Sequence, residues 1–133
     1  RHSVYCAGGS CTEHTDYGVL TLQQSTGPGL EAFIGGAWQP LEPPGGHALA
    51  FAGDMLERLT NGRVPALRHR VRMPADDGPE GAARQSHIFF LQPDKDTVVQ
   101  PMPPYARGDG SDLPPVRYGD WHHVKTSLAF RRQ

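Results

Sequence analysis

The sequence has 133 residues, of which 37% are hydrophobic and 20% are charged, and its formal net charge is -1. This length suits one domain, so we expect residues 1–133 to form a single core domain. The composition excludes a disordered chain, and no apolar run approaches the roughly 20 residues that cross a bilayer. The near balance of charge argues against nucleic acid and against a membrane as partners.

Glycine and proline are abundant, with 16 and 13 residues, and they are spread along the chain. This distribution favours short strands joined by tight turns. Residues rich in β-formers predict strands over 19–24, 30–34, 37–41 and 47–52. Residues 54–60 then predict one or two helical turns with Asp54 as the N-cap, ending at the turn signal Asn61-Gly62.

Two further strands are predicted in the second half of the chain, over 67–72 and 85–91. Between them, residues 74–83 (PADDGPEGAA) have the small and charged composition of an exposed loop. Beyond Pro101 the chain is irregular, apart from a short helix predicted over 119–124. The pattern as a whole predicts a fold dominated by β-strands with short helices.

Cys6 and Cys11 are the two cysteines of the sequence. The first residues lack the profile of a secretion signal, which favours a reducing, cytoplasmic location and free thiols. A disulfide between the two remains sterically open. The chain begins at Arg1 rather than at Met, within a strand-like stretch, so we expect it to be part of a longer protein.

His14 and Asp16 place an imidazole and a carboxylate two residues apart. On an extended backbone both side chains point to the same face. His69, inside another predicted strand, is a third candidate ligand about 50 residues later. Two imidazoles and one carboxylate form the facial triad of non-haem Fe(II) oxygenases, which leaves positions on the metal open. We therefore predict a divalent-metal site, with Fe(II) as its metal and His14, Asp16 and His69 as catalytic ligands.

Arg84 and Ser86 also lie two residues apart on a predicted strand, so they share a face. An arginine binds a carboxylate with two charge-assisted hydrogen bonds, and a serine hydroxyl adds a directional one. The pair therefore predicts an anchor for a carboxylate. His87 points to the opposite face and is interpreted as a packing or surface residue.

These motifs, taken together, resemble the C-terminal half of 2-oxoglutarate and Fe(II)-dependent dioxygenases, and most of all the isopenicillin N synthase-like branch. The resemblance rests on ordered segments at family-like spacings: 14–22 (HTDYGVLTL), 29–31 (GLE), Trp38, 53–62 (GDMLERLTNG), 69–71 (HRV) and 84–86 (RQS). Shorter matches at 89–94, 119–121 and 131–132 are similar to the cephalosporin-forming, ring-expanding oxygenases of that branch.

The resemblance implies a double-stranded β-helix, or jelly-roll, core. It implies His14, Asp16 and His69 as iron ligands, and Arg84 with Ser86 as anchors of the distal carboxylate of 2-oxoglutarate. Tyr5 occupies the place of a tyrosine that contacts this co-substrate in many relatives, although Cys6 replaces the proline that follows it there. The family's helical N-terminal region has no counterpart in residues 1–133.

The implied activity is the oxidation of a small-molecule substrate with dioxygen, coupled to decarboxylation of 2-oxoglutarate to succinate. Hydroxylation, desaturation and ring formation or expansion are all compatible with these residues. Two alternatives remain open at this point. Isopenicillin N synthase shares the arginine-serine pair yet uses no 2-oxoglutarate, and a non-catalytic jelly-roll binding module would share the fold.

Overall fold

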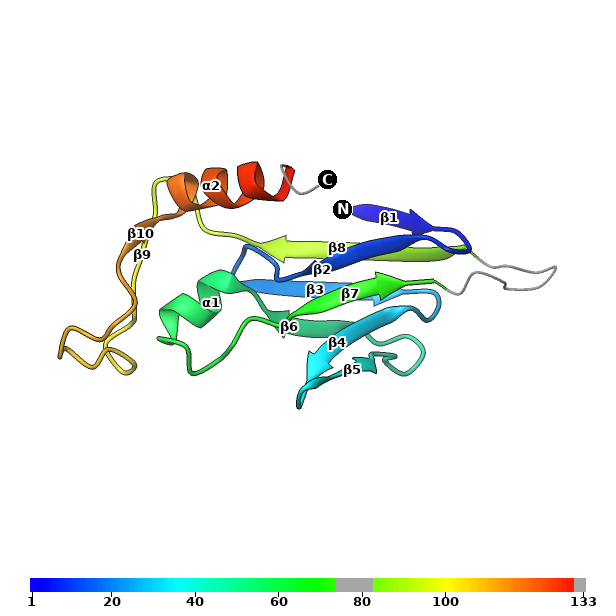
Figure 1. Ribbon diagram of the computed structural model, residues 1–133, viewed down its shortest axis with the longest axis horizontal. Coiled ribbons are helices and arrows are strands. Elements are labelled where there is room, and N and C mark those ends of the chain that lie inside the picture. Colours follow the sequence, from blue (N-terminus) through cyan, green and yellow to red (C-terminus); the bar gives the residue numbers. More distant parts are fainter. Residues whose placement is uncertain (74–82, 131–133) are drawn as a thin grey trace.

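The computed structural model describes residues 1–73 and 83–130 of the chain (Figure 1). Two four-stranded antiparallel sheets make up the body of the fold, in the strand orders β1-β8-β3-β6 and β2-β7-β4-β5. The first sheet contains β1 (His2–Tyr5), β8 (Arg84–Leu91), β3 (Leu20–Ser25) and β6 (Leu49–Ala52). The second contains β2 (Ser10–His14), β7 (His69–Arg72), β4 (Leu30–Ile34) and β5 (Ala37–Pro40).

Both sheets are built mainly from strands that are distant in sequence. Strand β8, for example, pairs with β1 and with β3, so two strands from the start of the chain meet one late strand. Two facing four-stranded antiparallel sheets with such crossovers form a jelly roll. The predicted fold class is thereby confirmed.

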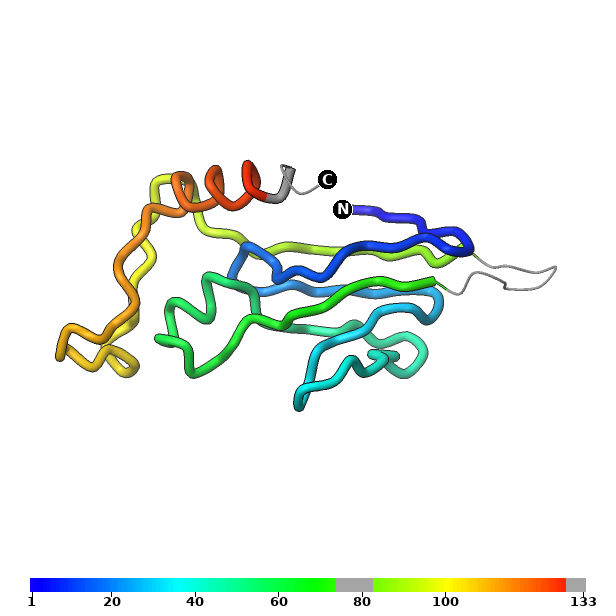
Figure 2. Tube along the Cα trace, in the orientation of Figure 1, coloured from blue at the N-terminus to red at the C-terminus, as the bar shows by residue number. Residues whose placement is uncertain are grey.

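The remaining elements lie at one end of the sheets. They are helix α1 (Asp54–Leu59), the short pair β9 (Val98–Val99) and β10 (Val116–Arg117), and helix α2 (Tyr118–Phe130). The trace in Figure 2 shows the yellow and orange segments around β9 and β10 extending beyond the ends of the sheets. No helix among the described residues is both long and apolar enough to cross a membrane.

Most predicted strands agree with the observed ones to within two residues, but both helices differ from expectation. The N-cap of α1 is Gly53 and not Asp54, which is the first residue inside the helix. Helix α2 runs on past the predicted end at residue 124, since no glycine or proline follows Gly119 and Thr126 bonds back to the carbonyl of His122 at 2.9 Å. The predicted 74–83 loop, except for Ala83, and the 131–132 match lie outside the described residues.

The apolar core is divided into two clusters. One centres on Leu30, Val71 and Met73, between the sheets, and the other on Met55, Val99 and Tyr118, beneath the helices. The interior also holds seven polar side chains that are less than a tenth exposed; Thr60 is at the end of α1, and the other six are Asp16, Thr21, Gln23, His69, Arg84 and Ser86. Buried polar groups need partners or a ligand, so this part of the interior is built for binding rather than for packing.

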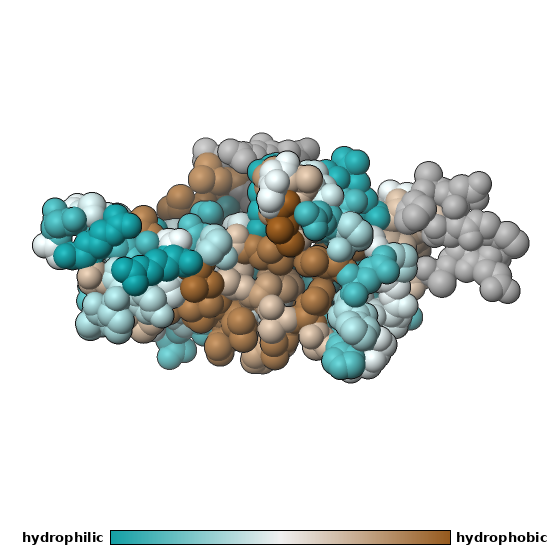
Figure 3. All heavy atoms as spheres, turned by 90° about the horizontal axis from the view of Figure 1, so that it is seen from below, coloured by the Kyte–Doolittle hydropathy of each residue, from teal (hydrophilic) through white to brown (hydrophobic). Residues whose placement is uncertain are grey.

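Apolar side chains also lie on the outer side of the first sheet. Leu22 and Phe89 are register partners on β3 and β8, and Phe89 is 60% exposed. From below, Figure 3 shows apolar surface gathered over the middle of the molecule between hydrophilic flanks. Exposed apolar side chains are common on soluble proteins, and we assign no role to these.

Candidate active site

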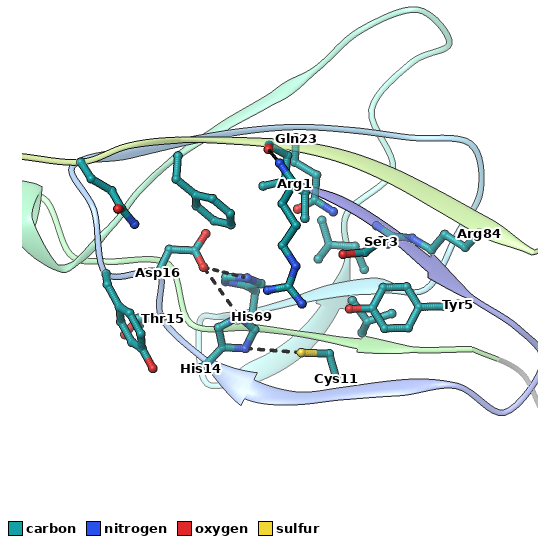
Figure 4. Close-up of a pocket in the computed structure, with 16 residues that line it drawn as sticks. Arg1, Ser3, Tyr5, Cys11, His14, Thr15, Asp16, Gln23, His69 and Arg84 are labelled. Carbon is teal, nitrogen blue, oxygen red and sulfur yellow. Dashed lines mark hydrogen bonds and ion pairs between the residues drawn. The ribbon is translucent and has the colours of Figure 1, made fainter. Parts of the chain in front are cut away.

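A cavity of about 280 Å³ opens between the two sheets. Both sheets contribute to its wall, because His14 and His69 come from β2 and β7 whereas Tyr5 and Arg84 come from β1 and β8. Figure 4 shows the labelled side chains of both groups pointing into this space. The volume lies near the lower end of the range for small-molecule sites.

His14, Asp16 and His69 meet at one end of the cavity, and one ligand atom from each lies within 4.8 Å of the others. His14 and His69 are register partners on neighbouring strands, which brings their rings to 4.4 Å between centroids. Oδ1 of Asp16 lies 3.6 Å from Nε2 of His14 and 3.9 Å from Nε2 of His69 (Figure 4). The structure thus brings the three predicted ligands together.

The far nitrogen of each imidazole is held by a backbone carbonyl. Nδ1 of His14 lies 2.8 Å from the carbonyl of Thr12, and Nδ1 of His69 lies 3.0 Å from that of Leu67. A carbonyl only accepts, so both Nδ1 atoms carry the proton and both Nε2 lone pairs face Asp16. This tautomer is the one in which two histidines offer Nε2 to a metal.

The two histidines differ in their electrostatic surroundings. Burial lowers the pKa of His69, which keeps this imidazole neutral and ready to bind a metal. The contact of Nδ1 of His14 with Sγ of Cys11, at 3.9 Å, raises the pKa of His14. A cation therefore competes with a proton mainly at His14.

Asp16 follows β2 in a loop that the start of α1 holds in place. Its backbone carbonyl accepts a hydrogen bond from the amide of Asp54 at 2.8 Å, and the carbonyl of Gly18 accepts one from the amide of Met55 at 2.9 Å. These amides are the first of α1, so carbonyls of the loop accept hydrogen bonds at the helix end where a side-chain cap was predicted. A Cβ on Gly53 would stand 2.4 Å from the carbonyl oxygen of Gly18, which explains a glycine at the N-cap.

Arg84 lies at the other end of the cavity, with Ser86 beside it on the inner face of β8. The guanidinium donates to Oγ of Ser86 and, at 2.8 Å, to Oγ of Ser25 on β3. The residue is only 1% exposed, and its buried Nε has no partner. Among the described residues no carboxylate forms an ion pair with it.

A buried cation without a counter-ion is costly. Burial accordingly lowers the pKa of Arg84 from its ordinary value. An orphaned Nε and an unbalanced charge are what a carboxylate ligand would satisfy, because the guanidinium fork binds a carboxylate through two parallel hydrogen bonds. The residues present therefore fit a dicarboxylate that reaches from Arg84 towards the three candidate metal ligands.

Tyr5 is the register partner of Arg84 and lines the same cavity, with its ring centroid 5.9 Å from the guanidinium carbon. Burial raises its pKa, so the phenol keeps its proton and remains a donor. The placement is compatible with the predicted contact to a co-substrate. His87 points to the outer face, as predicted, and stacks on His2 at 4.8 Å between ring centroids.

Several site residues were absent from the sequence-based prediction. Thr21 donates a hydrogen bond of 2.6 Å to Oδ2 of Asp16, and Ser25 supports Arg84. Both lie on β3 with Gln23, so every second residue of this strand is a polar side chain that faces inward. The alternation of these residues with Leu20 and Leu22 marks one face of the strand as polar, but this sequence signal does not say that the polar face is the buried one. Cys11 and Arg1, which also line the cavity, carry no such signal.

Comparison with known proteins agrees with this geometry. Residues 5–93 match the family model described as the 2OG-Fe(II) oxygenase superfamily. The chain is 34% identical over 116 residues to 2-oxoglutarate-dependent dioxygenase 19 of rice, covering 86% of this chain and 33% of that protein. It is also 34% identical over 113 residues to isopenicillin N synthase of Streptomyces griseus, covering 84% of this chain and 32% of that enzyme.

A solved structure shares the fold. The crystal structure of a dioxygenase for auxin oxidation in rice superposes with a TM-score of 0.78 at 27% identity, over 94% of this chain and 42% of that one. The chain spans about a third of the length of the curated relatives it matches.

Proposed function

Since the chain belongs to the 2OG-Fe(II) oxygenase superfamily, we propose that it is the metal- and co-substrate-binding core of an Fe(II)- and 2-oxoglutarate-dependent oxygenase that oxidises a small molecule. The observation that carries this proposal is the pairing of two sites in one cavity. Three convergent ligand atoms lie at one end, and a buried arginine without a counter-ion lies at the other.

In this proposal His14, Asp16 and His69 would hold the iron. Arg84 and Ser86 bind the distal carboxylate of 2-oxoglutarate, and Tyr5 contacts the same molecule from β1. When bound, Fe(II), 2-oxoglutarate and dioxygen supply the oxidising chemistry, in which the co-substrate is decarboxylated to succinate while a C–H bond of the substrate is oxidised.

The chain's own residues fix the geometry of that chemistry. The carbonyls of Thr12 and Leu67 orient the two imidazoles, and Thr21 orients the carboxylate of Asp16. Ser25 and Ser86 hold the guanidinium of Arg84 before any ligand arrives. Such preorganisation lowers the entropic cost of placing the reactants. The sheets enclose the cavity and limit the access of water.

The test begins with binding under anaerobic conditions. We expect the protein to bind Fe(II) and, with 2-oxoglutarate, to develop a metal-to-ligand absorption band. On admission of dioxygen it should form succinate slowly even without a primary substrate. Asp16→Ala is expected to abolish the band and the succinate, whereas Asp94→Ala, at an exposed aspartate, should leave both unchanged.

The other outcomes separate the alternatives. The similarity to isopenicillin N synthase supports an oxidase that needs no 2-oxoglutarate. That function would be favoured if the protein consumed dioxygen with iron but without 2-oxoglutarate, and if the addition of 2-oxoglutarate produced no absorption band. A wild-type protein that binds neither metal nor 2-oxoglutarate would contradict the proposal and leave a non-catalytic binding module. The assignment of residues 1–133 to a single domain stays a prediction.

A further inference from the structure

Arg1 is a second cation in the active-site cavity, and the proposed reaction leaves it without a role. Its backbone is paired with β8, because the amide of Ile88 donates to the carbonyl of Arg1 at 2.8 Å and the nitrogen of Arg1 donates to the carbonyl of Ile88 at 2.7 Å. Arg1 therefore extends the pairing of β1 with β8 by one residue, and its side-chain direction is set by the strand.

Alternation along β1 places Arg1 on the inner face. Ser3 and Tyr5 line the cavity, whereas His2 stacks on His87 outside and Val4 is 52% exposed. Figure 4 shows the guanidinium of Arg1 between the metal-ligating group on one side and Ser3 and Tyr5 on the other. Among the residues described, no carboxylate forms an ion pair with this guanidinium.

The sum of the charges in the proposed active site indicates which kind of ligand Arg1 would bind. Within residues 1–73 and 83–130, Asp16 and Arg84 are the other charged residues that line the cavity. The doubly positive iron and Arg84 together carry three positive charges, and Asp16 with the dianion 2-oxoglutarate carries three negative ones. The proposed centre is thus neutral without Arg1. Arg1 is solvent-exposed but lines the cavity, and its positive charge is not needed for this balance, so it favours an additional anion at this place.

We propose that Arg1 binds a carboxylate of the primary substrate, so that the substrate class is small monocarboxylates with an apolar body. This inference rests on the proposed function. One carboxylate supplies the single negative charge that neutralises Arg1 and fits its guanidinium fork. A phosphate monoester would bring nearly two. Ile88 and Phe90, next to Arg1 on the inner face of β8, line the cavity and offer an apolar wall to the rest of the substrate.

Binding of matched probes tests the proposal. Zn(II) replaces iron, 2-oxoglutarate is present at saturation, and saturation-transfer NMR measures the affinities of hexanoate, phenylacetate and cyclohexanecarboxylate and of their primary amides. We expect each carboxylate to bind the wild-type protein at least about tenfold more tightly than its amide, because one partner of the hydrogen bonds is charged. Arg1→Gln should remove this preference, and Arg1→Lys should keep part of it. His2→Gln, which changes the outward neighbour, should have no effect.

The proposal is overturned if no carboxylate binds, if amides bind as well as acids, or if Arg1→Gln keeps the preference. The affinity for 2-oxoglutarate is measured separately with each variant. An Arg1→Gln protein that loses affinity for 2-oxoglutarate to the same degree would place Arg1 in the co-substrate site, which contradicts the inference while the proposed function stands. A wild-type protein that binds no 2-oxoglutarate contradicts both.

Discussion

Oδ2 of Asp16 accepts a hydrogen bond of 2.6 Å from the hydroxyl of Thr21, while Oδ1 of the same carboxylate faces both histidines. Thr21 is 1% exposed and lies on β3, in the sheet opposite the one that carries the histidines. One carboxylate oxygen is thus committed to the protein and the other is left for a cation. Outer partners of this kind fix the orientation of metal ligands.

The first prediction concerns this hydrogen bond. Thr21→Val keeps the shape of the side chain and removes its donor, so Asp16 loses its orienting partner. We expect Fe(II) affinity to fall by about 10-fold to 100-fold, measured by anaerobic titration. Thr21→Ser restores the hydroxyl and should bind as the wild type does. Unchanged metal affinity in Thr21→Val would mean that the backbone bonds around Asp16 suffice to orient it.

The second prediction separates the two ends of the cavity. Arg84→Lys keeps a positive charge but loses the fork that Ser25 and Ser86 orient. We expect affinity for 2-oxoglutarate to fall by about tenfold or more, with Fe(II) affinity unchanged. The matched control is Arg72→Lys, at an exposed arginine on β7. Equal loss of metal and 2-oxoglutarate binding would indicate a folding defect instead.

The third prediction concerns the close approach of Gly53 to the loop that carries Asp16. An alanine Cβ there would lie 2.4 Å from the carbonyl oxygen of Gly18 and 2.9 Å from that of Asp16, and these are backbone atoms. We expect Gly53→Ala to lower the free energy of unfolding by about 1–3 kcal/mol and to weaken metal binding. Gly45→Ala, where nothing lies within 4 Å of the added Cβ, is the control. Chemical denaturation measures both.

The fourth prediction is a dependence on pH away from the cavity. Backbone amides of Arg107 and Gly108 donate to the carboxylate of Asp112 and lower its pKa, with help from Asn61. A lowered native pKa stabilises the fold above the unfolded-state value, near 3.9, and this contribution is lost as the pH falls through the native value.

We therefore expect the amide signals of Arg107 and Gly108 in NMR spectra to hold their positions down to about pH 4 and to shift below it. In Asp112→Asn the carboxylate is absent, so these signals should show no such acid transition. A transition of the wild type at or above the ordinary aspartate pKa would contradict the assignment.

The candidate ligands were easier to predict from the sequence than the residues that support them. His14, Asp16 and His69, with Arg84 and Ser86, are recognisable because two-residue spacings put side chains on one face and because their order resembles a known family. The structure brings the first four to the wall of one cavity and places Ser86 against the guanidinium of Arg84. Their assigned roles stay predictions until the variants are measured.

The inner face of β3 could not be predicted by the same reasoning. Its alternation of leucine with polar residues allows either face to be buried, and the usual rule would bury Leu20 and Leu22. In the structure Thr21 and Gln23 are buried, and Leu22 is 39% exposed. The rule fails here because this interior holds charged side chains that need polar partners. The prediction of Asp54 as the N-cap of α1 failed for a related reason. Backbone carbonyls distant in sequence, and not a side chain, accept hydrogen bonds from the first amides of the helix.

The division of the site between the two sheets has a mechanical consequence. The histidines belong to one sheet and Arg84 to the other. A molecule bound at both ends would therefore connect the two sheets through the middle of the fold. Apolar packing is thin at that point, where the buried side chains are polar. Saturation with metal and 2-oxoglutarate should therefore raise resistance to unfolding well beyond what either alone confers. Without iron, the folded protein would then unfold more readily than with it.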